Sequence, residues 1–111
     1  MQYGGPAKIL VFGGQGREAV MYYVYVLLCS NSQSEIFEFY TGSSKNLDQR
    51  TIDHGTKSVK TTKKFDKIEL VYYEACLNKK DALIREMQLK TGFGRGYIKR
   101  RMENYLKELR W

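Results

Sequence analysis

The 111-residue sequence is poor in proline, cysteine and histidine, with one Pro, two Cys and one His. Cys29 and Cys76 lie far apart with no second pair beside them, which excludes a disulfide framework and a CxxC metal site. Each ends a strand-like run, so we expect buried thiols in a reducing compartment. No apolar run approaches the roughly 18 residues of a membrane span, and ILVF after Lys8 is too short for a signal peptide. We therefore expect a cytoplasmic protein without a membrane partner.

The composition is that of one globular domain with a modest core, since 42% of the residues are hydrophobic and 28% are charged. Lys and Arg number 19 and Asp and Glu number 12, which gives a net charge of +7. This balance favours a polyanionic partner. A basic surface that only maintains solubility is the alternative.

Residues 1–20 differ from the rest of the chain, because they hold half of its ten glycines and its only proline. KILVFGGQGREA is similar to the first strand and phosphate loop of a nucleotide-binding βα unit, but neither a useful helix nor a second such unit follows. We interpret 1–20 as a poorly attached extension, or as the product of an upstream start before Met21. Residues 21–111 then form the domain.

Aromatic and branched side chains predict strands over 22–29, 36–42 and 68–76. The first two form a hairpin with a long tip, and the third joins their sheet. Alternation along the first strand places Val24 and Val26 on one face and Tyr25 and Leu27 on the other.

Three segments predict helices: 46–54, 78–92 and 96–110. Asn46 and Asn78 are suited to cap the first two, and each of these ends at a glycine. The third carries one apolar stripe, made of Ile98, Met102, Tyr105 and Leu109. The expected fold is α+β, a small three-stranded sheet flanked by helices in the order β-β-α-β-α-α.

The segment FYTGSSKNLDQRTIDHG, 39–55, contains little apolar surface. On its predicted helix Leu47, Arg50 and His54 share one side, so a guanidinium and an imidazole lie beside a strand end. That pair suits a phosphate. A solvated surface helix with incidental charges is an equal alternative at this point.

Glu86 falls inside the predicted core-facing arc of the second helix, between Ala82 and Leu83, with Arg85 opposite. An isolated buried carboxylate is costly, so it must be paired or must bind a cation. Lys90, four residues on, offers a structural ion pair. A divalent metal is the functional reading, and the spacing does not decide between them.

Taken together, these residues resemble the GIY-YIG nuclease domain, most closely its small standalone bacterial members. The resemblance covers 21 to about 101 and rests on Tyr23-Val24-Tyr25, Tyr40-Thr41-Gly42, Arg50, His54 and Glu86. The two motifs read YVY and YTG, so only Tyr25, Tyr40 and Gly42 keep the name-giving positions. A lysine after the first tyrosine, present in some members, is replaced here by apolar residues, and a site asparagine of some members has no located equivalent.

The resemblance implies a three-stranded antiparallel sheet and a single-metal phosphodiesterase. Glu86 would hold one Mg²⁺ or Mn²⁺, which prefers oxygen ligands. Tyr25 would be the general base, its phenol acidified by the nearby cation. Arg50 would stabilise the phosphate with its planar fork of donors.

The remaining motif residues receive supporting roles from the same resemblance. Tyr40 and His54 would orient the water or assist proton transfer. Gly42 would allow its strand and the neighbouring strand to approach the helix closely.

Two basic segments are the expected nucleic-acid contacts, with solvated charge as the alternative for each. They contribute Lys57, Lys60, Lys63 and Lys64 from one loop, and Arg95, Lys99 and Arg100 around a helix N-terminus. Such contacts carry no sequence code and predict a steep salt dependence. We therefore expect selection by DNA structure, for nicked, flapped or single-stranded substrates.

DNA is favoured over RNA as the partner, and the expected state is a monomer or weak dimer. Two other classes remain open. One is a catalytically silent module that stacks bases on its tyrosines. The other is an adaptor for an acidic protein. A requirement for metal would distinguish the nuclease from both.

Overall fold

The computed structural model describes residues 20–32, 37–55 and 64–109. The elements follow in the order β1 (Tyr22–Ser30), β2 (Phe37–Ser44), α1 (Leu47–Gly55), β3 (Lys67–Cys76), α2 (Lys79–Leu89), α3 (Gly92–Arg101) and α4 (Glu103–Glu108). The α+β class is confirmed, with one more helix than expected. The predictions for the N-terminal extension and for the middle of the hairpin tip lie outside the described residues.

The sheet is antiparallel with the strand order β2-β1-β3, as the resemblance implied. β1 is central because it is the most apolar strand, and its residues from Val24 to Ser30 are all buried. In the register, Tyr25 of β1 lies opposite Gly42 of β2 and Tyr73 of β3. β2 is therefore an edge strand, and the YVY and YTG motifs lie side by side.

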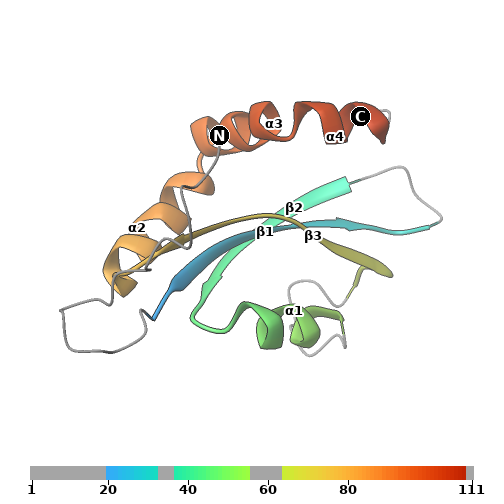
Figure 1. The fold of residues 1–111 in the computed structure, drawn as a ribbon. Helices are drawn as coiled ribbons and strands as arrows, with labels where there is room; N and C mark the ends of the chain where they lie inside the picture. The colour runs from blue at the N-terminus through green and yellow to red at the C-terminus, as the bar shows by residue number, and fades with distance from the viewer. Residues whose placement is uncertain (1–19, 33–36, 56–63, 110–111) are drawn as a thin grey trace, which may run out of the picture.

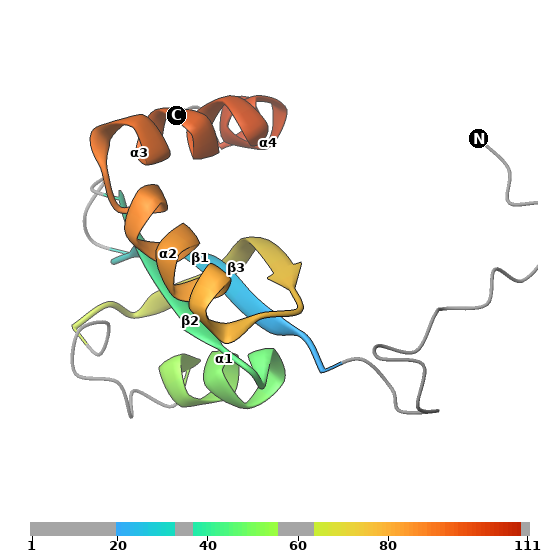
Figure 2. The ribbon, with the colours of Figure 1, turned by 90° about the vertical axis from the view of Figure 1, so that its left-hand side faces the viewer.

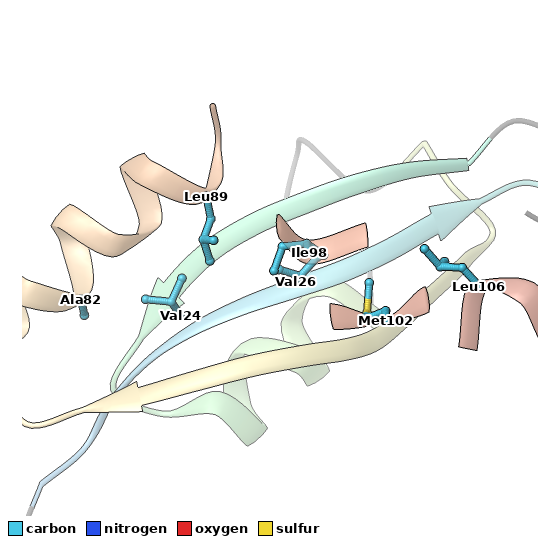
Figure 3. Packing of buried hydrophobic residues seen from close by; sticks show 7 residues of the cluster. All are labelled: Val24, Val26, Ala82, Leu89, Ile98, Met102 and Leu106. Atoms are coloured by element: carbon cyan, nitrogen blue, oxygen red, sulfur yellow. The ribbon is translucent and has the colours of Figure 1, made fainter. Parts of the chain in front are cut away.

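The two faces of the sheet are covered by different helices, α1 on one side and α2, α3 and α4 on the other (Figures 1 and 2). The predicted alternation along β1 is confirmed. One face contributes to a core made of Val24, Val26, Ala82, Leu89, Ile98, Met102 and Leu106 (Figure 3). The other contributes to a smaller cluster made of Tyr25, Leu27, Cys29 and Phe65.

The boundaries of the last helices differ from those predicted. Gly92 does not end α2, which stops at Leu89, but begins α3, whose N-cap Thr91 accepts a hydrogen bond from the Gly94 N–H at 3.1 Å. Gly94 packs against the α2 backbone at Leu89, where a β-carbon would overlap it. This close approach turns the chain. The predicted single helix over 96–110 is two helices that break at Met102.

The predicted apolar stripe of that region is largely correct, since Ile98 and Met102 are buried and Tyr105 packs against the core. Leu106 takes the buried place expected for Leu109. The break at Met102 rotates the following turn and brings a different side chain inward.

The cysteines have different environments. Cys29 is buried as predicted, and burial raises its pKa to about 11. Cys76 is only half-buried, which corrects the prediction for that residue. Cys29 pairs with Ile68 and Cys76 pairs with Tyr22, so the two thiols lie at opposite ends of the β1–β3 ladder. Within the described segments, no helix has the length and apolarity needed to cross a membrane.

Candidate active site

The side chains of the resemblance meet at the β2 edge of the sheet, around Tyr25. Its side chain is 1% exposed and lies on the α1 face. The Arg50 Nε donates to its hydroxyl oxygen at 3.2 Å, and the His54 Nε2 lies 3.1 Å from the same atom. One phenol therefore joins the central strand to two residues of the first helix.

α1 delivers both residues because its start and its facing side are fixed. The Asn46 side chain accepts from the Gln49 N–H at 3.0 Å, which confirms the predicted cap. Leu47 packs against the cluster that contains Tyr25. Arg50 and His54 follow one turn apart on the same side, as predicted. His54 is fully buried, so it contacts the Tyr25 hydroxyl from the protein interior.

Tyr40 completes this face of the site. Its ring lies edge-on to His54, with centroids 4.8 Å apart, and 6.3 Å from the Tyr25 ring. Tyr40 precedes Gly42 by two residues on β2, so both point to the α1 face. The two motif tyrosines and the imidazole thus form one aromatic cluster.

Gly42 makes room for Tyr25 rather than for a helix. A β-carbon at Gly42 would overlap the Tyr25 hydroxyl and ring. The predicted reason for this glycine, a close approach of strands and helix, is therefore corrected. The phenol crosses the β2 backbone at the position where β2 has no side chain.

The ionisation of this face follows from its burial. Burial raises the pKa of Tyr25 above its ordinary value, and the hydrogen bond from Arg50 opposes that shift. Burial and the nearby Arg50 charge lower the pKa of His54. The phenol is thus protonated and the imidazole neutral. The resemblance implied a lowered pKa for Tyr25, but the protein groups around it raise that pKa instead.

Hydrogen-bond polarity follows from these charges. A guanidinium only donates, so the Tyr25 oxygen accepts from Arg50. In the imidazole tautomer that carries its proton on Nδ1, His54 Nε2 accepts the Tyr25 proton across the 3.1 Å contact. In that tautomer the contact is a path for a proton from the phenol to His54.

Glu86 reaches the same edge from the opposite face of the sheet. Ser43 of β2 donates its hydroxyl to Glu86 Oε1 at 2.6 Å, and Lys90 Nζ lies 2.7 Å from Oε2. Because Ser43 follows Gly42, the carboxylate and the Tyr25 phenol are held by adjacent residues of one strand. The negative charge of Glu86 also contributes to the raised pKa of Tyr25.

The surroundings of Glu86 correct part of the helical-wheel prediction. Ala82 and Leu89 are buried, but Leu83 is exposed, so the core-facing arc of α2 is narrower than predicted. Glu86 lies at its margin, with a side chain 18% exposed. Burial raises the pKa of Glu86, but the hydrogen bonds from Lys90 and Ser43 together lower it below the ordinary value. The carboxylate is charged at neutral pH.

Arg85, predicted on the outer side of α2, is instead partly buried. Its Nε and Nη2 donate to the two oxygens of Glu74 at 2.8 and 2.9 Å, and its guanidinium stacks on the Tyr97 ring. Tyr72 also donates to Glu74, at 2.8 Å. This network joins β3, α2 and α3 and fixes the rotation of α2, and with it the direction of Glu86.

The donor set at Glu86 suits Mg²⁺ or Mn²⁺. Among the described residues, no group of three or more His, Cys, Asp or Glu side chains is placed to hold a metal. Mg²⁺ is commonly bound by one or two carboxylates, with waters and substrate phosphates as the other ligands. Glu86 is charged and partly exposed, and its Oε2 already faces a cation in Lys90. The ion-pair alternative is thus present, and a metal ion at Glu86 would share or replace the Lys90 contact.

The predicted nucleic-acid contacts are only partly described. Lys57, Lys60 and Lys63 lie outside the described residues. Lys64 is exposed, 3.7 Å from Glu38 and stacked over Phe65.

The second basic group, Arg95, Lys99 and Arg100, is exposed on α3. That helix covers the face away from α1 (Figure 1).

Ser43 is a site residue that sequence reasoning missed. The alternation of side chains along a strand could have indicated it. Gly42 lies on the α1 face, so the next residue, Ser43, points to the α2 face. Only the packing of α2 shows that its partner is Glu86.

The matching family model is the GIY-YIG catalytic domain, over residues 21–110. A UPF0213 protein of Staphylococcus epidermidis is 37% identical over 71 residues, which cover 63% of this chain and 80% of that protein. A UPF0213 protein of Bacillus pumilus is 28% identical over 90 residues, 80% of this chain and 82% of that protein. Comparison with solved structures gives no significant match. The chain therefore belongs to the GIY-YIG family, a family of nucleases.

Proposed function

We propose that this protein is a metal-dependent endonuclease that hydrolyses DNA phosphodiester bonds and selects its substrate by structure rather than sequence. The observation that carries the proposal is the Tyr25 hydroxyl, bonded to Arg50 and His54 on one side of Gly42 while Ser43 holds Glu86 on the other. A phosphate at this edge meets an acid-base pair, a fixed cation and a carboxylate.

Arg50 binds the scissile phosphate in this proposal. Its hydrogen bond to Tyr25 raises its pKa further, so it stays charged at every working pH. A charged donor aimed at the phosphate oxygens stabilises the negative charge that develops in the transition state. The bond to Tyr25 sets its direction.

Tyr25 and His54 move the proton. The attacking water gives a proton to the Tyr25 oxygen as the phenol proton passes to His54 Nε2. The water oxygen forms its bond to phosphorus, the bond to the leaving sugar oxygen breaks, and that oxygen takes a proton from solvent. Because the pKa of Tyr25 is raised, the relay to His54 removes the need for a free phenolate. Tyr40 holds the imidazole ring in place.

Glu86 would hold the divalent ion, with Ser43 keeping the carboxylate in position. When bound, Mg²⁺ or Mn²⁺ supplies positive charge to the phosphate and lowers the pKa of nearby acids.

The test is cleavage of labelled nicked, flapped, single-stranded and intact duplex DNA, with and without Mg²⁺ or Mn²⁺. Glu86→Gln and Arg50→Ala are expected to reduce cleavage by at least about 100-fold, the usual effect of removing a transition-state contact. Lys107→Ala, in an exposed pair on α4, is the control that keeps full activity. Matched RNA substrates test the preference for DNA.

Cleavage without metal, or full activity of both site variants, would contradict the proposal. Equal cleavage of intact duplex would refute structural selectivity alone. If the wild type binds DNA tightly but cuts none of these substrates under either metal, the silent binding module becomes the better description.

A further inference from the structure

A cleft of about 310 Å³ opens between the first turn of α2 and the adjoining ends of β1 and β2. Figure 2 shows α2 lying alongside these strands. Its polar lining consists of Ser43, Ser44, Lys45 and Lys79, and Tyr22, Ala82 and Leu83 supply the apolar part. None of the roles assigned above uses this cleft beyond the Ser43 hydroxyl.

We propose that this cleft binds one nucleotide of the substrate next to the scissile phosphate, with Lys45 and Lys79 on its phosphate group. The inference rests on the proposed function, because it assigns the chemistry of the occupant from the site beside it. It adds a substrate contact on β2 and α2, away from the basic segments predicted from the sequence.

The charge of the cleft specifies an anion. Two lysines line it and no carboxylate does. Among the described residues, neither Lys45 nor Lys79 forms an ion pair, whereas Lys64, Lys67 and Lys90 each do. Two lysines at one cavity concentrate positive charge there, and a bound anion offsets the repulsion between them. Phosphate is the anion that the proposed function places at the neighbouring site.

Both lysines are carried by fixed backbone. The Ser44 hydroxyl accepts from the Asn46 N–H at 3.0 Å and donates to the Asn46 carbonyl at 3.1 Å, which closes a turn over Lys45. The Asn78 side chain accepts from the Lys80 and Asp81 N–H groups at 2.8 and 3.2 Å and so fixes the first turn of α2. Lys45 and Lys79 thus stand on backbone that local hydrogen bonds hold, one just after β2 and one at the start of α2.

The cleft adjoins the proposed active site at Ser43. That residue lines the cleft and donates to Glu86. A strand bound at Glu86 would therefore pass directly into the cleft. The apolar wall at Tyr22 and Leu83 suits a sugar or base face, and the volume is at the small end of ligand sites. One nucleotide, rather than a duplex, matches this size.

The test is binding of a short labelled single-stranded DNA in EDTA, where cleavage does not contribute. Lys45→Ala and Lys79→Ala are each expected to weaken binding about 3- to 10-fold. Each should also reduce the slope of log K against log salt by about 0.7, the value for one lost contact on single strands. Lys80→Ala is the matched control, since Lys80 is also exposed in the first turn of α2 but does not line the cleft.

A second pair of variants tests the apolar side of the cleft, where Leu83 lies. Leu83→Glu places a carboxylate in the cleft, and Met87→Glu places one on the same helix outside it. Both positions are exposed, so both variants should fold. We expect Leu83→Glu alone to reduce binding by more than about 10-fold.

Equal effects of Lys79→Ala and Lys80→Ala on affinity and on the salt slope would contradict the proposed nucleotide site. Equal effects of Leu83→Glu and Met87→Glu on binding would contradict it as well. These binding results are independent of cleavage. If the cleft variants lose binding but the wild type never cleaves DNA, the nucleotide site stands and the nuclease proposal fails. If the wild type cleaves DNA but the cleft variants bind as it does, the nuclease proposal stands and the nucleotide site fails.

Discussion

Tyr25 is at once a core residue and the centre of the candidate site. Its ring fills the cluster on the α1 face, while its hydroxyl meets Arg50 and His54. A strand tyrosine is ordinarily a packing residue with a satisfied hydroxyl. Here the hydroxyl is bonded to a cation, Arg50, and to an acid-base group, His54. Packing around the Tyr25 ring holds these three side chains in a fixed geometry.

Replacement of Gly42 by alanine tests this fit. The new methyl group would displace the Tyr25 phenol from Arg50 and His54. We expect a loss of about 1–3 kcal/mol in the free energy of unfolding, as for other overpacked sites, together with loss of nucleic-acid cleavage. Urea denaturation gives the first quantity and the cleavage assay the second.

Gly92→Ala is the matched control, because no atom lies within 4 Å of a β-carbon there. It should change stability by less than about 0.5 kcal/mol. Equal stability of the two variants would show that Tyr25 moves aside at no cost.

His54 makes stability depend on pH. Burial and the Arg50 charge lower its pKa in the folded state, so between that value and the ordinary value near 6.5 the unfolded chain binds more protons. Its contribution is therefore complete above about pH 6.5 and is lost as the pH falls toward the folded value. Each unit of lowering corresponds to about 1.4 kcal/mol.

The measurement is urea denaturation of wild type and His54→Gln between about pH 8 and pH 5.5. His54 is the only histidine in the chain, so the difference in slope isolates it from the carboxylates. Wild type should lose more stability on acidification than the variant. Parallel pH profiles would show that the imidazole is not held neutral.

At the scale of elements, α2 is positioned by a polar network rather than by apolar burial alone. Only Ala82 and Leu89 of this helix are buried. The bidentate contact of Arg85 with Glu74 joins α2 to β3 and fixes the helix about its own axis. The rotation matters because Glu86 is the next residue.

Arg85→Lys tests that role. A lysine supplies a point charge and cannot make both bonds to Glu74 or stack in the same way on Tyr97. We expect a loss of about 1–3 kcal/mol in unfolding free energy, measured by urea denaturation. If Glu86 holds the proposed metal ion, Mn²⁺ titration should also show weaker binding.

Breaking the exposed Lys107–Glu103 pair with Lys107→Ala provides the comparison, since its side chains are 72% and 66% exposed. Such pairs contribute less than about 1 kcal/mol. A similar loss in both variants would mean that the Arg85 network is an ordinary surface contact.

At the scale of the whole molecule, the candidate site spans the sheet edge. Tyr25, Arg50 and His54 lie on the α1 face, and Glu86 arrives from the α2 face. β2, whose Gly42 and Ser43 contact the two halves, is an edge strand. Ser43 also lines the cleft.

The cations of this chain, whose net charge is +7, lie on several elements in the part of the chain that the structure describes. The exposed cations of α3 lie on the face away from α1, while Lys45 and Lys79 flank the β2 edge. Long-range attraction of a polyanion is a property of the whole chain. Contact near the candidate site depends on the few cations at the edge.

The strands, the fold class and most element starts could be predicted from the sequence, because they depend on local chemistry. The run at 22–29 is apolar on both faces, so it forms the central strand. Asn46, Asn78 and the 3.6-residue period that joins Arg50 to His54 act within one turn. Their outcome does not depend on the rest of the chain.

Tertiary structure decided what depends on distant contacts. Gly94 approaches α2 closely, so a new helix begins where the sequence predicted the end of one. Gly42 is required because Tyr25 packs over it. Arg85 is partly buried because it bonds to Glu74. Ser43 became a partner of Glu86 because α2 packs across β2. Spacing along the chain specifies which side chains share a face, but the pKa of Tyr25 and the charge of a cleft depend on what the fold places around them.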